Sequence, residues 1–312
     1  MPAATRPARA DPGWSPWEPL ALPHRFTPAS LRETLDGGQA FRWRWHDEPA
    51  AWQGIFGEHA VQLRLGAGAT PGGPQRNHSP DPLWFRAATD PIRTRAALGH
   101  YLGMTGELET VLARLPLTSD AVLAAAVAAC PGLILLRQPF AEALLAFILS
   151  STKQIPQIRQ LCETLALRFG AELAPGLHAL PTWERLATVG ERELRACALG
   201  FRARYVHETA QLLAAHPGWL AAIEAAAYPE ARTALGTLPG VGEKVADCVL
   251  LFGAGRLEAF PVDVWILRTL AEHYGLHGWR PAQLAQFGRA HFGPFAGLAQ
   301  QYLFAAARSR RR

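Results

Sequence analysis

The spacing of apolar residues changes along this chain, and that change restricts the fold more than any other feature. Apolar and polar residues alternate in Gln39–Trp45, and Ala51–Phe56 and His59–Leu65 follow as further short segments of the strand type. Alternation of period two is typical of strands with one buried face, so we interpret residues 31–65 as sheet. From about residue 91 the apolar residues recur instead at helical spacing, and Gly and Pro separate the segments. The sequence therefore predicts a mainly α protein with an N-terminal α+β part built on an antiparallel sheet.

After the sheet, we expect helices in the segments that lie between successive Gly and Pro residues. The predicted helices are Ser119–Ala129, Pro139–Leu149, Ile155–Phe169, Thr182–Thr188, Glu191–Cys197, Ala203–Ala215, Gly218–Ala226, Tyr228–Leu235, Lys244–Phe252, Val264–His273 and Pro281–His291. A chain of 312 residues has room for two domains of about 100–200 residues each. We predict a disordered lead-in over 1–22, a sheet domain over 23–115 and an all-α domain over 116–312.

Basic residues slightly outnumber acidic ones, and almost all of them are arginine. The chain has 31 Lys and Arg against 26 Asp and Glu, a net charge of +5, and its only lysines are Lys153 and Lys244. Such a balance suits a nucleic-acid partner without requiring one. No apolar run approaches the ~18 residues of a membrane span, and the N-terminus has no apolar core of a secretory signal. We therefore expect neither membrane attachment nor secretion.

The cysteines are scattered rather than clustered. Cys130, Cys162, Cys197 and Cys248 lie far apart and form no CxxC pair. Because metal and iron–sulfur sites need clustered ligands, we expect no metal and no cofactor. Buried thiols in a reducing compartment are the expected arrangement.

The segment Leu238-Pro-Gly-Val-Gly242 separates two predicted helices. Gly240 and Gly242 allow the backbone to turn tightly and to approach a ligand closely. With Val241 they would present amide groups at the start of the second helix, where an anion such as a DNA phosphate binds. The sequence predicts a helix–hairpin–helix that contacts DNA through its backbone.

Lys244 stands at the start of that second helix. A lysine amine can lose its proton and attack carbon, whereas an arginine in proteins cannot. In a chain that uses arginine almost everywhere, a lysine here favours a nucleophile over a phosphate contact, which arginine would serve as well. The phosphate-contact interpretation remains the alternative.

Asp263 follows the apolar residues Pro261 and Val262 and precedes an apolar helix. It is a candidate N-cap. Its carboxylate could also stabilise a developing oxocarbenium ion or move a proton. A cap with no further role is the alternative.

Together these motifs resemble the helix–hairpin–helix base-excision glycosylases, and specifically the 8-oxoguanine DNA glycosylase/AP lyase family. The resemblance extends over roughly 31–307. The further motifs that carry it are Gly38–Trp43, Leu135–Gln138, Leu199–Tyr205 and Gly293–Gln300. It implies that 23–115 is the N-terminal domain of this family and that 116–312 is its DNA glycosylase domain.

The resemblance also implies a chemistry and a partner. Lys244 would attack C1′ of a damaged nucleotide in duplex DNA and form a Schiff base, and Asp263 would assist. The base would first be flipped out of the stack. Phe201 would fill the gap as a wedge, and Arg202 would contact the orphaned cytosine. Such glycosylases resemble monomers.

The implied base pocket has four residues. Gly38 would offer its carbonyl to the proton on N7 of 8-oxoguanine, which guanine lacks. Cys248 and Phe304 would sandwich the flipped base, and Gln300 would read its Watson–Crick edge. For Cys248 and Phe304, plain packing in the core is the alternative.

Three positions depart from the family pattern. Thr152 replaces an asparagine and Gln157 replaces an arginine, both of which contact the orphaned cytosine in the eukaryotic-type enzymes. Trp265 replaces a histidine two residues after the aspartate. We still expect Thr152 and Gln157 to contact the DNA at the orphaned base, and because both differ from the family pattern we expect relaxed discrimination of the base opposite the lesion.

Other functions remain open at this point. A monofunctional alkylpurine glycosylase of the same fold typically lacks the hairpin lysine. The endonuclease III and adenine-mismatch branch usually carries a four-cysteine cluster, which these cysteines cannot supply. A non-catalytic helix–hairpin–helix DNA-binding protein needs neither Lys244 nor Asp263. The expected location is the nucleoid in a bacterium or the nucleus in a eukaryote.

Overall fold

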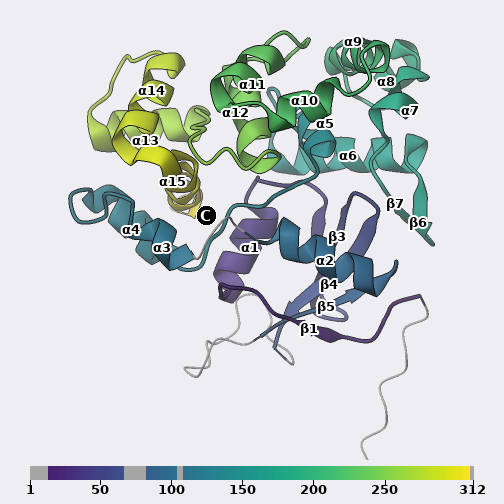
Figure 1. The fold of residues 1–312 in the computed structure, drawn as a ribbon, viewed down its shortest axis with the longest axis horizontal. Helices are drawn as coiled ribbons and strands as arrows, with labels where there is room; N and C mark the ends of the chain where they lie inside the picture. The colour runs from purple at the N-terminus through teal and green to yellow at the C-terminus, as the bar shows by residue number, and fades with distance from the viewer. Residues whose placement is uncertain (1–12, 67–81, 104–107, 310–312) are drawn as a thin grey trace, which may run out of the picture.

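The computed structural model describes residues 13–66, 82–103 and 108–309. A sheet with two helices lies on one side of the molecule, and most of the other helices lie on the other side (Figure 1). The sheet is five-stranded and antiparallel, with the order β1-β5-β4-β3-β2. Its strands are β1 (Glu18–Leu20), β2 (Trp43–His46), β3 (Ala51–Phe56), β4 (His59–Leu65) and β5 (Leu83–Ala87).

The first helix lies where the sequence analysis placed sheet. Helix α1 spans Pro28–Asp36 and the first predicted strand begins only at Trp43, so the prediction of sheet from residue 31 is wrong up to residue 42. Thr27 caps the helix by accepting from the Ser30 amide at 3.0 Å, and Pro28 occupies the first turn. A cap followed by proline sets the start of a helix.

The two ends of the sheet also differ from the prediction. Strand β1 lies inside the segment 1–22, for which no order was predicted, so that prediction is wrong over Glu18–Leu20. Residues 1–12 of the lead-in lie outside the described residues. Strand β2 begins at Trp43, whose ring packs on Gly54 of β3, where an added Cβ would lie 2.4 Å from the ring. Its indole N–H donates to the Tyr101 hydroxyl at 3.0 Å.

The helical part agrees closely with the prediction. The remaining elements are α2 (Pro91–Tyr101), α3 (Leu108–Leu112), α4 (Ala121–Ala129), α5 (Phe140–Leu149), α6 (Ile155–Phe169), β6 (Glu172–Ala174), β7 (Leu177–His178), α7 (Trp183–Ala187), α8 (Glu191–Arg195), α9 (Arg202–Ala215), α10 (Trp219–Ala225), α11 (Tyr228–Leu235), α12 (Glu243–Phe252), α13 (Val264–Tyr274), α14 (Pro281–Phe292), the 3₁₀ turn η1 (Gly293–Phe295) and α15 (Ala296–Ser309). The predicted fold class, an antiparallel-sheet part followed by a helical part, is confirmed. Helices α2, α3 and α15 and the two-stranded ribbon β6–β7 were not among the predicted elements.

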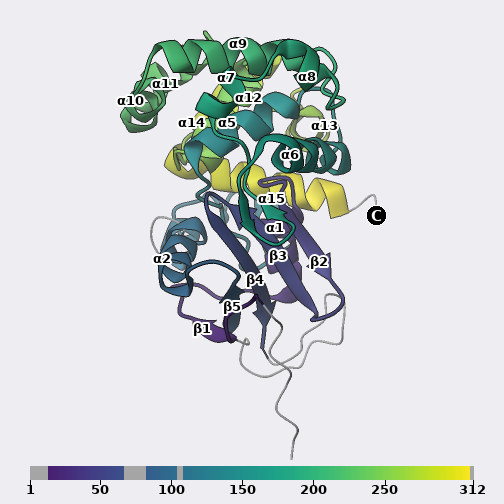
Figure 2. The same ribbon diagram turned by 90° about the vertical axis from the view of Figure 1, so that its right-hand side faces the viewer.

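The sheet and the helices share one hydrophobic core. Gln39 joins them: its side chain donates to Ile134 O at 2.8 Å and accepts from the Leu136 amide at 2.9 Å. Its own carbonyl accepts from the Gln138 side chain at 2.7 Å. Helix α15 lies between the sheet and the upper helices (Figure 2). The segment around Gly38 is therefore fixed against the helical part. Among the described residues, no helix has the length and apolarity needed to span a membrane.

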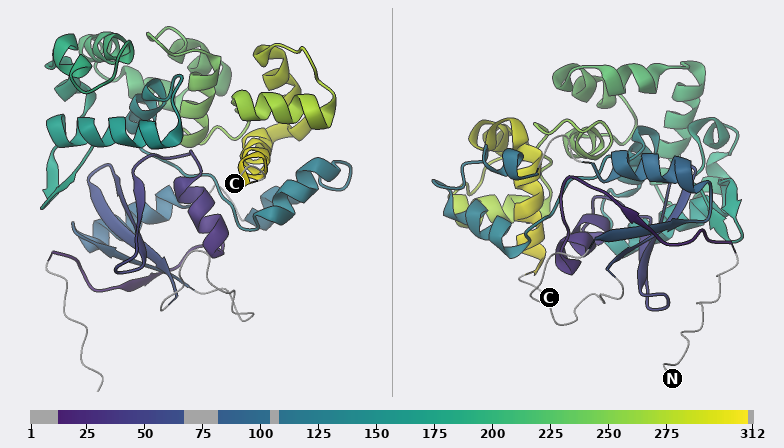
Figure 3. Two further views of the ribbon diagram at one scale, coloured as in Figure 1. Left: turned by 180° about the vertical axis from the view of Figure 1, so that it is seen from behind. Right: turned by 60° about the horizontal axis from the view of Figure 1, so that its bottom comes forward.

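A buried carboxylate fastens the C-terminal helices together. Asp120 caps α4, which packs beside α15 (Figure 3), by accepting from the Leu123 amide at 2.8 Å. It also accepts from the Tyr274 hydroxyl at 2.9 Å and lies 2.9 Å from Nε2 of His291. Burial would raise the pKa of Asp120, but the hydrogen bonds from Leu123, His291 and Tyr274 outweigh it and lower that pKa. Asp120 thus ties α4 to α13 and α14.

We expect Asp120→Ala to lower the free energy of unfolding by about 2–4 kcal/mol, since it removes a cap and leaves buried donors unpaired. The control is Asp90→Ala, which removes an exposed cap from α2 and should cost about 1 kcal/mol. Because the pKa of Asp120 is lowered in the folded state, its contribution is present above the ordinary carboxyl pKa. It disappears as the pH falls through the lowered value. Urea unfolding across this pH range measures both effects, and equal losses in the two variants would contradict the prediction.

Candidate active site

The predicted hairpin forms between α11 and α12. Gly240 has φ +77°, and an added Cβ there would lie 2.3 Å from the ring of Tyr205. Glycine is therefore required both by the turn and by the close approach of α9. Gly242 is the N-cap of α12 and no side chain caps this helix, so its first turn is open to an anion.

Val241 plays a different part from the one expected. Its side chain is buried, and its amide donates to Leu238 O at 3.1 Å inside the turn. Its amide is therefore occupied within the protein, and the prediction that it faces DNA does not fit this arrangement. Val241 anchors the hairpin in the core.

Lys244 lies in the first turn of α12, as predicted. Its Nζ is 5.3 Å from the centroid of the Phe147 ring, and the side chain is half-buried. One turn later on the same helix is Cys248, which is buried. Burial raises the pKa of Cys248 to about 11, although the nearby Lys244 opposes this shift. The thiol is therefore neutral and does not compete with the amine as a nucleophile.

Asp263 is the N-cap of α13, and it lies close enough to Lys244 for the two charges to interact. Its Oδ1 accepts from the amides of Trp265 at 3.0 Å and Ile266 at 2.9 Å. Burial raises the pKa of Asp263, against the opposing effects of these two hydrogen bonds and of Lys244. The structure therefore brings the two predicted catalytic residues into one site.

Gly38 and Phe304 also come together. A Cβ added at Gly38, which has φ +99°, would lie 3.6 Å from Cε1 of Phe304 and 3.0 Å from Cδ1 of Ile155. Gln300 lies one turn before Phe304 on α15. It is 5% exposed, and its Oε1 is buried without a hydrogen-bond partner. A buried acceptor without a partner is uncommon in a protein interior, and it is available to a donor on a ligand.

The predicted wedge is the exposed aromatic residue Phe201, which is 47% exposed just before α9. Arg202, in contrast, is only 3% exposed and is bound within the protein. Thr152 lies beside it, and Gln157 accepts from the Gln154 amide at 3.1 Å at the start of α6. Contacts of these residues with DNA stay predictions.

A buried network behind the hairpin was not predicted from the sequence. Asp247 on α12 accepts from the Tyr228 hydroxyl at 2.8 Å and from Arg232 Nε at 3.0 Å. Arg289 of α14 reaches the same tyrosine hydroxyl at 3.3 Å. The one available signal was an acid within the apolar helix sequence, three residues after Lys244.

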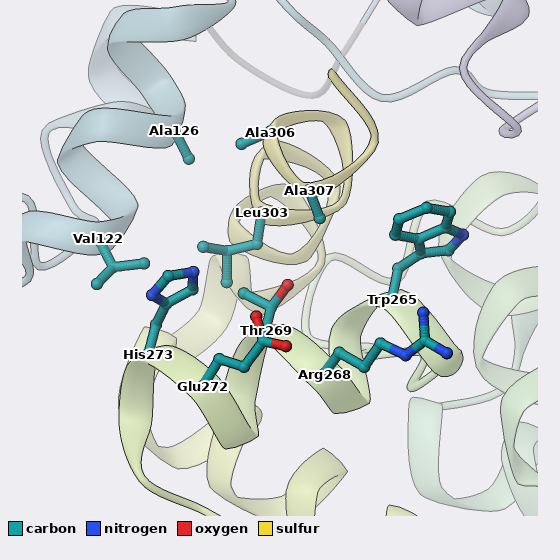
Figure 4. Close-up of a pocket in the computed structure, with 10 residues that line it drawn as sticks. All are labelled: Val122, Ala126, Trp265, Arg268, Thr269, Glu272, His273, Leu303, Ala306 and Ala307. Carbon is teal, nitrogen blue, oxygen red and sulfur yellow. The ribbon is translucent and has the colours of Figure 1, made fainter. Parts of the chain in front are cut away.

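A separate hollow of about 110 Å³ lies along α13, bounded by α4 and α15. Trp265 and Arg268 point to the same side of α13, near Ala307 (Figure 4). The hollow is lined neither by Lys244 nor by any of the four predicted base-pocket residues. We therefore place the site at the hairpin and the start of α13, not in this hollow.

The hairpin with its lysine, and the capping aspartate within range of that lysine, form the arrangement expected of a DNA glycosylase of the helix–hairpin–helix base-excision class. The family model described as the HhH-GPD superfamily base excision DNA repair protein matches residues 145–290. The model of the 8-oxoguanine DNA glycosylase N-terminal domain matches residues 21–144. The N-glycosylase/DNA lyase OGG1 of Arabidopsis thaliana is 32% identical, over 94% of this chain and 81% of that protein. The chain belongs to the 8-oxoguanine DNA glycosylase family.

Solved structures agree with this assignment. The 8-oxoguanine glycosylase/lyase of Clostridium acetobutylicum, in complex with double-stranded DNA that has cytosine opposite 8-oxoG, superposes with a TM-score of 0.80. It is 26% identical and the match covers 93% of this chain and 94% of that one. The 3-methyladenine DNA glycosylase of Archaeoglobus fulgidus, 20% identical with a TM-score of 0.71 over 95% of this chain and 99% of that one, shares the fold.

We expect Gly240→Ala to lower the free energy of unfolding by about 2–4 kcal/mol, through its left-handed backbone and its clash with Tyr205. Gly242→Ala is the matched control in the same hairpin. Its φ is −88°, and an added Cβ meets nothing within 4 Å. Thermal unfolding should therefore show a large loss for the first variant and little change for the second. Equal melting temperatures would contradict the argument.

Proposed function

We propose that this chain is a bifunctional DNA glycosylase and AP lyase that excises oxidised purines from duplex DNA, with Lys244 as nucleophile and Asp263 as its assisting carboxylate. Family membership confirms the predicted enzyme class and DNA as the partner. The observation that carries the assignment of roles is the placement of Lys244 in the open first turn of α12, within range of the Asp263 charge.

The chemistry follows from the two side chains. The neutral amine of Lys244 forms a bond to C1′ while the glycosidic bond breaks, and the base leaves after taking up a proton. The amine loses its protons as the sugar ring opens to give a Schiff base. Loss of a proton from C2′ then expels the 3′ phosphate by β-elimination, and water releases the lysine. Asp263 stabilises the positive charge that develops at C1′ during the first step.

The base pocket is proposed from Gly38, Cys248, Gln300 and Phe304. The unpartnered Oε1 of Gln300 matches the N–H donors on the Watson–Crick edge of a flipped guanine derivative. The Gly38 carbonyl is proposed to accept the N7 proton of 8-oxoguanine, and Cys248 and Phe304 to lie against the two faces of the base. The opening of α12 at Gly242 is proposed to bind a backbone phosphate.

The alternatives are less well supported. A monofunctional alkylpurine glycosylase shares this fold, but Lys244 would have no role in it. A non-catalytic DNA-binding protein would have no need for a carboxylate whose pKa is raised beside a lysine. We propose action at the nucleoid or in the nucleus, and domains that divide near residue 115.

The test is borohydride trapping on a duplex containing 8-oxoguanine. We expect a covalent adduct with the wild-type protein and its loss in Lys244→Gln, because glutamine has no nucleophilic amine. The control is Lys153→Gln, which removes the other lysine and should leave trapping intact. No adduct with wild type, or an undiminished one with Lys244→Gln, would show the proposal to be wrong.

The rate of base release should depend on the ionisation of Asp263. Burial raises the pKa of Asp263 above its ordinary value, so its carboxylate is protonated at pH values below that raised pKa. The rate of base release should therefore be low there and should rise as the pH increases through the raised pKa. Asp263→Asn should lower the rate by about 10²–10⁴-fold and should abolish this acidic limb. Single-turnover release measured between pH 4 and 8 decides the point. If the decrease in rate at acidic pH persists in Asp263→Asn, that decrease comes from the titration of another group.

A further inference from the structure

We infer that Thr152 is a positioning residue: its hydroxyl holds Arg202, and through Arg202 it fixes the ring of Phe201 in the orientation needed to enter the duplex. This inference rests on the proposed function, in which Phe201 fills the gap left by the flipped base. It replaces the expectation that Thr152 itself contacts the orphaned base.

The Arg202 guanidinium is held on all of its nitrogens. Nη2 donates to Thr152 Oγ1 at 2.8 Å, and Nε donates to Ser151 O at 2.9 Å, a carbonyl that Nη2 also reaches. Nη1 donates to Leu199 O at 3.2 Å. The residue is 3% exposed, so each of these donors would be left unpaired if its partner were removed. Arg202 therefore acts as a brace: it connects the turn between α5 and α6, at Ser151 and Thr152, to the segment that carries Phe201.

Arg202 also contacts the ring of Phe201, the proposed wedge, directly. The Arg202 Cζ lies 4.3 Å from the centroid of the Phe201 ring, at the distance of a cation–π contact. The Phe201 ring also makes a T-shaped contact with the ring of Tyr205, at 5.7 Å between centroids. Tyr205 in turn packs on Gly240 of the hairpin. An aromatic side chain that is 47% exposed is thus held between two neighbours.

The backbone at Thr152 points to the same role. Its φ is +56°, a left-handed conformation that is unfavourable for a β-branched residue. The turn that contains it ends α5 and precedes α6, and it presents both the Ser151 carbonyl and the Thr152 hydroxyl to Arg202. This conformation places two acceptors side by side for one guanidinium.

The hydrogen bonds of Arg202 within the protein limit how well it can distinguish the base opposite the lesion. A guanidinium already bound to three protein oxygens has few donors left to distinguish cytosine from other bases. The brace should therefore help wedge insertion and base flipping to a similar extent whichever base lies opposite the lesion.

The experiment compares Thr152→Val with Thr152→Ser. Valine keeps the β-branched shape at the left-handed position and lacks the hydroxyl, whereas serine keeps the hydroxyl. Two readouts are taken on duplexes with each of the four opposite bases: single-turnover release of 8-oxoguanine, and the fluorescence of a 2-aminopurine placed next to the lesion, which reports insertion of the wedge. Thr164→Val, at a helical position whose hydroxyl bonds only locally to Gln160 O, controls for loss of any threonine hydroxyl.

We expect Thr152→Val to lower release and the fluorescence change by about tenfold, the order expected for losing one hydrogen bond to a charged group. The loss should be similar for all four opposite bases, and Thr152→Ser should restore most of it. Arg202→Lys should cause a comparable loss, and adding Thr152→Val to it should cause little more, because both act through one contact.

Three results would overturn the inference. They are wild-type behaviour of Thr152→Val, a loss confined to duplexes with cytosine opposite the lesion, and losses that multiply in the double variant. A wild-type protein that inserts its wedge but releases no base would count against the proposed function instead, since the fluorescence readout does not require base release.

Discussion

The buried carboxylate of Asp247 is the constraint on which the site depends. It is 1% exposed on α12, and its partners Tyr228 and Arg232 both come from α11. Because a buried charge is tolerated only when it is paired and hydrogen-bonded, the two helices of the hairpin can pack in few arrangements. Burial raises the pKa of Asp247, while the tyrosine and the arginine oppose that shift. The position of Lys244, one turn before Asp247, follows from this packing.

Burial also decides which of two neighbouring side chains, Cys248 or Lys244, can act as the nucleophile in the proposed reaction. Cys248 and Lys244 lie on the same helix, and a thiolate would be the stronger nucleophile of the two. Burial raises the pKa of Cys248 to about 11, so the thiol remains protonated. Asp263 is half-buried, and two backbone amides and Lys244 favour its charged form against the effect of burial. The same apolar surroundings therefore keep the Cys248 thiol protonated and leave the amine of Lys244 as the nucleophile that we propose.

The sequence was informative where the signal was local. Strands β3 and β4 and helices α6 and α11 have the predicted bounds, because a glycine directly follows each of them and marks its end. Lys244 and Asp263 were found because each stands in a short motif. The sheet predicted over 31–36 was wrong because the capping pair Thr27 and Ser30 outweighs the strand pattern that follows.

What the sequence could not provide were contacts between distant segments. Nothing local in Arg202 indicates that it binds Ser151 and Thr152, some fifty residues earlier. Gly38 meets Phe304 only because Gln39 ties its loop to the segment Ile134–Gln138. The segment between α1 and β2 thus lies against α15, which comes from the other end of the chain. In the proposed base pocket the Gly38 carbonyl accepts the N7 proton, and a carbonyl whose position is fixed can distinguish a base that carries this proton from one that lacks it. The proposed discrimination therefore depends on a backbone held in place, and the hydrogen bonds of Gln39 hold the segment next to Gly38.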